Sequence, residues 1–183
     1  MSMTTPTTAS AWVIDAARSR VDFVVRHLTE TTVAGQFKKF DVDLLLDDRH
    51  PERSSLTARI DAASVDTGEP QRDALLRSPL FFDAKRFPFM TFTSRRIDVG
   101  GDGHVRVHGD LTIRDVTRPV TLVVTPSWKM RDPWGKVRAA FRAQVTIDRK
   151  DFGLTWNAAY EVGWIPIGDD IAIAVDAEVV KDR

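Results

Sequence analysis

The stretch VRVHGDLTI, residues 105–113, decides the fold class of this chain. Its apolar residues stand at every second position, and its polar residues stand between them, around a central glycine. Successive side chains of a β-strand point to opposite faces of a sheet, so this alternation predicts a strand with one face toward a core. A helix would instead need apolar residues three and four positions apart.

The same period of two recurs along most of the chain. The turns between the alternating segments are rich in Asp, Gly and Pro, as at 47–51, 100–103 and 132–135. No regular helices separate the segments, as parallel strands would require. We therefore predict an all-β protein, a single closed barrel of about eight antiparallel strands. The apolar stripes that would face its interior lie within residues 21–25, 33–37, 42–46, 56–60, 105–113, 120–124, 139–147 and 171–179.

One segment interrupts the alternation and predicts a short helical insertion at residues ~69–83. Thr67 has the chemistry of a helix N-cap, and Pro70 suits a first helical turn. Ser78 and Pro79 suggest that a second short helix begins there. We expect the two helices, rich in Leu and Phe, to form a lid over one end of the barrel.

The chain reads as one domain, residues 11–183, after a small polar tail, residues 1–10, that we expect to be disordered. The tail has neither the basic nor the apolar region of a secretory signal. No apolar run approaches the ~20 residues that an integral membrane segment requires. We expect a cytoplasmic protein.

Composition excludes several functions. Lys plus Arg equals Asp plus Glu at 26 each, so the net charge is zero, which argues against nucleic acid as a partner. The chain has no Cys, which excludes disulfides, thiolate metal sites and a Cys nucleophile.

Catalytic and metal-binding motifs are missing. The sequence has no nucleophile elbow, zinc-protease motif or phosphate-binding loop. His104 and His108 would lie about 13 Å apart along one strand, too far to share a metal directly. His27 continues the inward face of its strand and is open to three interpretations: a ligand contact, a general base, or a satisfied residue at the barrel rim. We predict no enzyme activity, no catalytic residues, no cofactor and no bound metal.

The inward stripes combine small and aromatic residues. Gly35, Ala58 and Gly109 lie on these stripes beside Phe23, Phe37 and other aromatic residues. An eight-stranded barrel either is filled by side chains or holds one small ligand. The pattern alone leaves both alternatives open and slightly favours the filled core.

The order of motifs along the chain resembles the YceI-like family of polyisoprenoid-binding, lipocalin-like barrels. The match covers nearly everything after residue 11. Arg18 and Asp115 depart from the family pattern, which usually has His and Gly there. The matching stretches are SRVDFVVRHL at 19–28, GQF at 35–37, IDAASVDTG at 60–68, RDALLRS at 72–78, FFD at 81–83, FP at 87–88, FTS at 92–94, GDLTIR at 109–114, VTRPV at 116–120 and RKDFGL at 149–154.

The resemblance implies a tunnel that binds, stores or transports a long-chain isoprenoid, such as a polyisoprenoid or a quinone-type lipid, and it also implies a homodimer. It favours an open interior over a filled one. The alternatives are an enzyme acting on an apolar substrate, with His27 as base and Arg26 or Asp73 assisting, and an interaction module without a ligand. Resemblance and inward stripes together predict the ligand-binding residues Phe23, Val25, His27, Phe37, Leu75, Phe81, Phe82, Phe92, Leu111, Phe141, Trp156 and Ile173.

Overall fold

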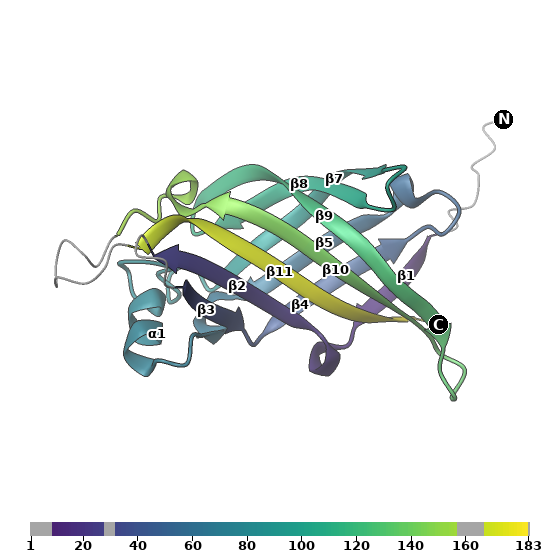
Figure 1. The fold of residues 1–183 in the computed structure, drawn as a ribbon. Coiled ribbons are helices and arrows are strands. Elements are labelled where there is room, and N and C mark those ends of the chain that lie inside the picture. The colour runs from purple at the N-terminus through teal and green to yellow at the C-terminus, as the bar shows by residue number, and fades with distance from the viewer. Residues whose placement is uncertain (1–8, 28–31, 157–166, 183) are drawn as a thin grey trace.

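The computed structural model describes residues 9–27, 32–156 and 167–182, and it is built almost entirely from β-strands (Figure 1). One α-helix, α1, spans Pro70–Arg77. The described strands are β1 Ser10–Ile14, β2 Arg20–His27, β3 Thr32–Phe37, β4 Phe40–Leu46, β5 Ser55–Asp61, β6 Val65–Asp66, β7 Phe89–Val99, β8 Val105–Ile113, β9 Val116–Arg131, β10 Val137–Asp148 and β11 Ile167–Lys181.

These segments form a closed barrel of eight long strands. Six of the labelled segments combine in pairs into three of these long strands, each of which is kinked where its two segments meet. β1 continues into β2 and β3 into β4, since β1 pairs with β4 at Trp12↔Leu44 and β2 pairs with β3 at Val21↔Phe37. β5 continues into β6 in the same way, since these strands pair with β4 and β3. β7 to β11 complete the ring, and β11 closes it against both β2 and β1. Every pairing is antiparallel, so the predicted eight-stranded antiparallel barrel is confirmed.

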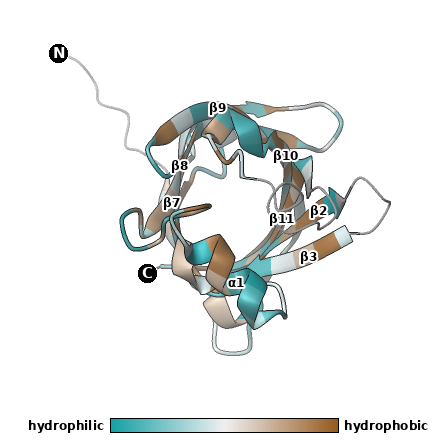
Figure 2. Ribbon diagram, turned by 90° about the vertical axis from the view of Figure 1, so that its left-hand side faces the viewer, coloured by the Kyte–Doolittle hydropathy of each residue, from teal (hydrophilic) through white to brown (hydrophobic). Residues whose placement is uncertain are grey.

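The interior holds the alternating apolar residues that the sequence indicates. Val107 and Ile113 of β8 are 5% exposed, whereas His108 between them is only partly buried. Figure 2, which looks along the barrel from the end where α1 lies, shows the strands as a ring. The turns predicted at 47–51, 100–103 and 132–135 lie between β4 and β5, β7 and β8, and β9 and β10. β1 begins at Ser10, the last residue of the expected tail, and residues 1–8 lie outside the described residues.

The helical insertion is shorter than predicted, and two of its details were wrong. α1 is the only α-helix among the described residues, and the expected second helix is a series of turns after Ser78. The N-cap is Glu69, whose carboxylate accepts a hydrogen bond from the Gln71 amide at 3.2 Å. Thr67 instead binds Asp73, which lies within α1. Pro70 occupies the first turn, as predicted.

A candidate ligand-binding interior

Two adjoining cavities occupy the barrel interior. The smaller, about 180 Å³, lies at the end beside α1, and the larger, about 520 Å³, extends to the opposite end. Val21, Ile60, Leu111 and Ile173 line both, so the two chambers meet at this belt of side chains. The larger chamber falls within the usual size range of small-molecule sites, roughly 300–1,000 Å³. The interior is therefore open, as the resemblance implied, and not filled as the pattern alone slightly favoured.

The smaller chamber is walled by aromatic rings from three parts of the chain. The ring centroids of Phe23 on β2 and Phe37 on β3 are 5.4 Å apart, and those of Phe37 and Phe82 are 5.8 Å apart. Phe81 meets Phe82 edge to face at 4.9 Å, a favoured aromatic geometry. The amide of Phe82 donates to the Leu76 carbonyl at 2.9 Å, which holds this turn against the end of α1. The segment that the sequence assigned to a second helix thus supplies part of the wall of the smaller chamber.

Small residues line the larger chamber and leave space in it. Ala58, Ala139, Ala143 and Ala177 lie on its wall, on β5, β10 and β11. The two inward glycines are different, because they add no free space to the chambers. A Cβ at Gly109 would lie 2.5 Å from Cζ of Phe92, and one at Gly35 would clash with the Phe23 ring. Aromatic rings from neighbouring strands already fill the space beside both glycines.

Eleven of the twelve predicted ligand-binding residues line one chamber or both, and only the side chain of His27 lies outside the described residues. His27 itself ends β2, where its backbone pairs with Ile167. Whether any of these residues contacts a ligand stays a prediction. Phe23, Val25, Phe37, Leu75, Phe81, Phe82 and Trp156 line the smaller chamber, Phe92 and Phe141 line the larger, and Leu111 and Ile173 line both.

α1 is held against the barrel by a buried polar contact at its start. The carboxylate of Asp73, 6% exposed, accepts hydrogen bonds from the amide and the hydroxyl of Thr67 at 2.9 and 2.6 Å. Arg72 donates to the same hydroxyl at 2.8 Å, and Arg77 donates to the Ala63 carbonyl at 2.9 Å. These contacts place Leu75 and Leu76 on the wall of the smaller chamber. They also engage Asp73, which the enzyme alternative had assigned to assist catalysis.

Arg149 belongs to the candidate site, and the sequence analysis did not identify it. It lines the smaller chamber but is 1% exposed, and its guanidinium donates to the carbonyls of Gly168 and Trp156 at 3.1 and 2.9 Å. An ion pair also joins Arg149 to Asp169 at 3.4 Å. Burial lowers the pKa of the Arg149 guanidinium from its ordinary value, against the opposing effect of Asp169 and Asp148. Asp148 caps the short 3-10 helix Arg149–Phe152 by accepting a hydrogen bond from the Lys150 amide, and only the fold shows that Arg149 points inward.

Few other polar groups lie at the smaller chamber. Arg72, Thr67 and Asp22 are the other polar residues at the smaller chamber. His104 and His108 bind Thr125 and Thr121 through Nδ1 at 2.9 and 2.8 Å. Within residues 9–27, 32–156 and 167–182, no group of three His, Asp or Glu side chains is arranged to hold a metal ion.

Fold and interior together define a lipocalin-like β-barrel, and comparison with known proteins names the family. The model of the YceI-like domain matches residues 12–179. Protein YceI of Salmonella newport strain SL254 is 34% identical over 163 residues, which cover 89% of this chain and 82% of the relative. The chain belongs to the YceI-like family.

Solved structures agree with this assignment. Burkholderia cenocepacia BcnA has a TM-score of 0.79 at 26% identity, with 90% of this chain and 98% of that chain covered. The Campylobacter jejuni YCEI protein has a TM-score of 0.75 at 28% identity, with coverages of 86% and 90%. A polyisoprenoid binding domain from Saccharophagus degradans shares the fold at a TM-score of 0.69 and 18% identity, with coverages of 94% and 99%.

Proposed function

We propose that this protein binds a long-chain isoprenoid, or a related apolar lipid such as a quinone-type lipid, in the barrel interior and stores or transports it. The observation that carries the proposal is the pair of adjoining chambers, whose walls are mostly aliphatic and aromatic. Each CH₂ group buried there would contribute about 0.8 kcal/mol before entropic costs. An apolar chain can therefore bind tightly with few polar contacts.

The dimensions of the barrel suit a long, thin ligand. The 15 residues of β11 extend over about 50 Å at ~3.4 Å per residue. A strand tilt of about 40° leaves a barrel about 40 Å long. The polyisoprenoid binding domain of Saccharophagus degradans has the same fold, which supports the same class of ligand here.

We propose binding without catalysis. The YceI-like fold is of a binding type, and the structure leaves the interior unfilled, which disfavours an interaction module with a solid core. The enzyme alternative loses its assisting carboxylate, because Asp73 is engaged by Thr67. Turnover that is lost in His27→Ala while lipid binding stays intact would revive that alternative.

The homodimer and the cytoplasmic location expected from the sequence remain proposals. Sedimentation of the purified protein tests the first, and cell fractionation tests the second. Among the described residues, no helix has both the length and the apolar character needed to cross a bilayer.

Extraction of the purified protein with organic solvent, followed by mass spectrometry, tests the proposal directly. We expect a stoichiometric isoprenoid or other long-chain lipid. An extract that stays empty, even after incubation with total membrane lipids, would contradict the proposed function.

A pair of variants on one strand locates the ligand. Ala177 of β11 lines the larger chamber, whereas Ala172 of the same strand is exposed. Ala177→Phe should fill empty space and reduce the bound lipid at least tenfold, and Ala172→Phe should leave it unchanged. Equal lipid content in the two variants would place the ligand outside the larger chamber.

A further inference from the structure

The turn between β9 and β10 projects beyond the barrel at the end opposite α1 (Figure 1). It carries large apolar side chains that are rarely exposed together on a protein surface. Trp134 at the turn is 83% exposed, and Met130 and Trp128 at the end of β9 are 56% and 40% exposed. Apolar side chains gathered at one end of a molecule usually mark a contact surface.

The same hairpin borders the opening of the larger chamber. Trp128 and Lys129 of β9 line that chamber together with Asp48 and Pro51 from the loop between β4 and β5. The ammonium of Lys129 binds Asp48 at 2.8 Å and so joins the hairpin to this loop. A ligand that enters the larger chamber at this end therefore passes Trp128 and Lys129.

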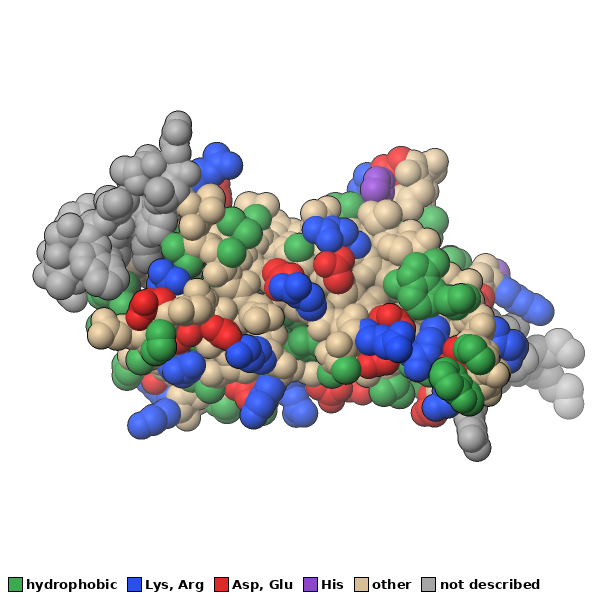
Figure 3. Space-filling view, turned by 60° about the horizontal axis from the view of Figure 1, so that its bottom comes forward, with side chains coloured by type: hydrophobic (Ala, Val, Ile, Leu, Met, Phe, Trp, Pro, Cys, Tyr) green, Lys and Arg blue, Asp and Glu red, His purple; other side chains and the backbone are tan. Residues whose placement is uncertain are grey.

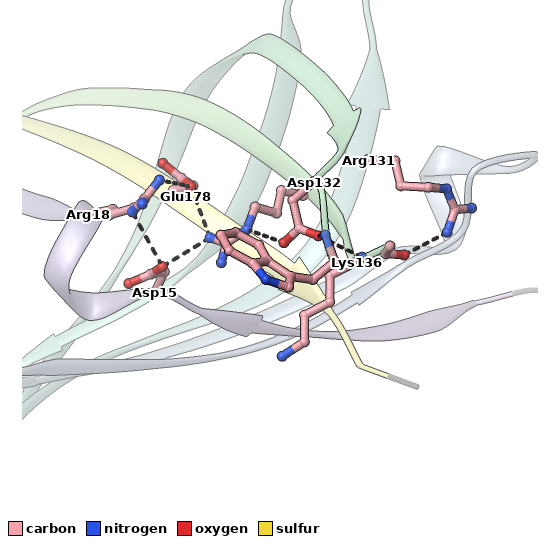
Figure 4. A network of polar contacts seen from close by, with 9 residues as sticks. Asp15, Arg18, Arg131, Asp132, Lys136 and Glu178 are labelled. Carbon is pink, nitrogen blue, oxygen red and sulfur yellow. Dashed lines mark hydrogen bonds and ion pairs between the residues drawn. The ribbon is translucent and has the colours of Figure 1, made fainter.

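Polar contacts stiffen the turn (Figure 4). The carboxylate of Asp132 accepts hydrogen bonds from the amides of Trp134 and Lys136 at 3.0 and 2.8 Å, and from Nε of Arg138 at 3.1 Å. Arg138 also binds Asp15 and Glu178 at 3.1 Å each, on the neighbouring wall of the barrel. Trp134 is thus presented by a fixed turn, which lowers the entropic cost of a contact made through it.

The charge of the hairpin is positive. Residues 128–138 contain four basic residues and one acidic residue, Asp132, which Arg138 neutralises. Lys129 is paired with Asp48. Among the described residues, Arg131 and Lys136 remain on either side of Trp134 without a carboxylate partner. Figure 3 shows hydrophobic and basic side chains side by side at this end of the molecule.

We propose that the β9–β10 hairpin docks the barrel on a bilayer that contains anionic lipids, with Trp134 in the interface and Arg131 and Lys136 against the head groups. Tryptophan favours the boundary between water and lipid, and basic residues are attracted to anionic membrane surfaces. The proposal rests on the proposed function, because a long apolar lipid has to be collected from a membrane or delivered to one. Docking would place the opening of the larger chamber at the surface that holds the ligand.

A membrane suits this surface better than a protein partner or a second copy of the chain. A stable protein interface buries roughly 800 Å² on each partner, which a narrow projecting turn does not offer. An interfacial membrane contact needs only a few aromatic side chains and adjacent positive charge.

Flotation of the full chain with vesicles tests the proposal. The probes are phosphatidylcholine vesicles with and without phosphatidylglycerol, at low salt. We expect binding to the anionic vesicles that salt weakens. Trp134→Ser and Lys136→Glu should each reduce it roughly tenfold.

Matched variants at the other end provide the control. Leu80, 49% exposed, and Lys85, also exposed, lie in the segment after α1. Leu80→Ser and Lys85→Glu should leave vesicle binding unchanged. Equal losses in the two sets, equal binding to neutral and anionic vesicles, or self-association through Trp134 without vesicle binding would each overturn the proposal.

Failure of the docking proposal can be distinguished from failure of the proposed function. Trp134 lines neither chamber, so Trp134→Ser should retain its extracted lipid and lose only vesicle binding. Lipid in the extract without vesicle binding overturns the docking alone. Vesicle binding by a protein that never carries lipid overturns the proposed function alone.

Discussion

Phe23 and Gly35 lie directly opposite each other on β2 and β3, and the Phe23 ring covers the glycine. A Cβ at position 35 would come within 2.8 Å of Cε1 of that ring, closer than real Cβ atoms approach other atoms. The ring is also 5.4 Å from Phe37, so it cannot move without disturbing the aromatic wall of the smaller chamber.

Gly35→Ala should therefore destabilise the protein by about 1–3 kcal/mol, the usual cost of overpacking. Urea denaturation measures the effect. Gly101→Ala is the matched control, because nothing lies within 4 Å of the added Cβ and the backbone there needs no positive φ. Equal stability of the two variants would show that the aromatic wall of the smaller chamber accommodates the added Cβ without loss of stability.

Arg149→Lys should destabilise the protein by about 3 kcal/mol, because an ammonium cannot reach the carbonyls of Leu154, Trp156 and Gly168 at once. Arg95→Lys is the control: its side chain is 71% exposed and its pair with Asp110 should be worth less than about 1 kcal/mol. Thermal or urea unfolding compares the two. A small effect at Arg149 would mean that its contacts do not support the fold.

Asp73→Asn should loosen α1 without unfolding the barrel. The neutral amide oxygen would accept the Thr67 hydrogen bonds more weakly than the carboxylate does. Amide hydrogen exchange within residues 70–77 should become roughly tenfold faster, while the strands stay protected. Asp115→Asn, at an exposed position between β8 and β9, should change amide exchange neither in residues 70–77 nor in the strands. Uniformly faster exchange would contradict a local role.

Acid should weaken the turn that presents Trp134. Although its partial burial acts in the opposite direction, hydrogen bonds from the Lys136 amide, Arg138 and the Trp134 amide hold the pKa of Asp132 below its ordinary value. The carboxylate therefore contributes stability above its unfolded pKa of about 3.9, and this is lost as the pH falls through the folded pKa.

The stability difference between the wild type and Asp132→Asn measures this contribution. It should be constant at neutral pH and should shrink toward zero between about pH 5 and pH 2. A difference that does not depend on pH would mean that the carboxylate charge is unimportant.

The inward stripes were predictable because strand alternation is a local property of the sequence. Val107, Leu111 and Ile113 are buried as their spacing indicates. The number of long strands in the barrel, eight, was also predictable, but the kinks that divide three of these strands were not. Those kinks depend on pairing between residues far apart, such as Trp12 with Leu44.

The candidate site was predictable where it consists of stripe residues and motif residues. It was not predictable where a neighbour determines the outcome. Gly35 leaves no space because the Phe23 ring covers it. Thr67 caps no helix because its hydroxyl binds Asp73, and Glu69 accepts the hydrogen bond from the Gln71 amide instead. Arg149 was not predictable as a residue of this site, since nothing in the local sequence indicates that it binds three carbonyls.

β11 pairs with β10 along nearly all its length and closes the ring against β2 and β1. It is also the last described strand to be synthesised. The earlier strands can assemble during translation only as an open, curved sheet with its apolar face exposed. The chambers form when β11 pairs with its neighbours. A lipid can therefore be enclosed only after synthesis has passed residue 181. Until then the exposed apolar face of the nascent chain needs protection from aggregation.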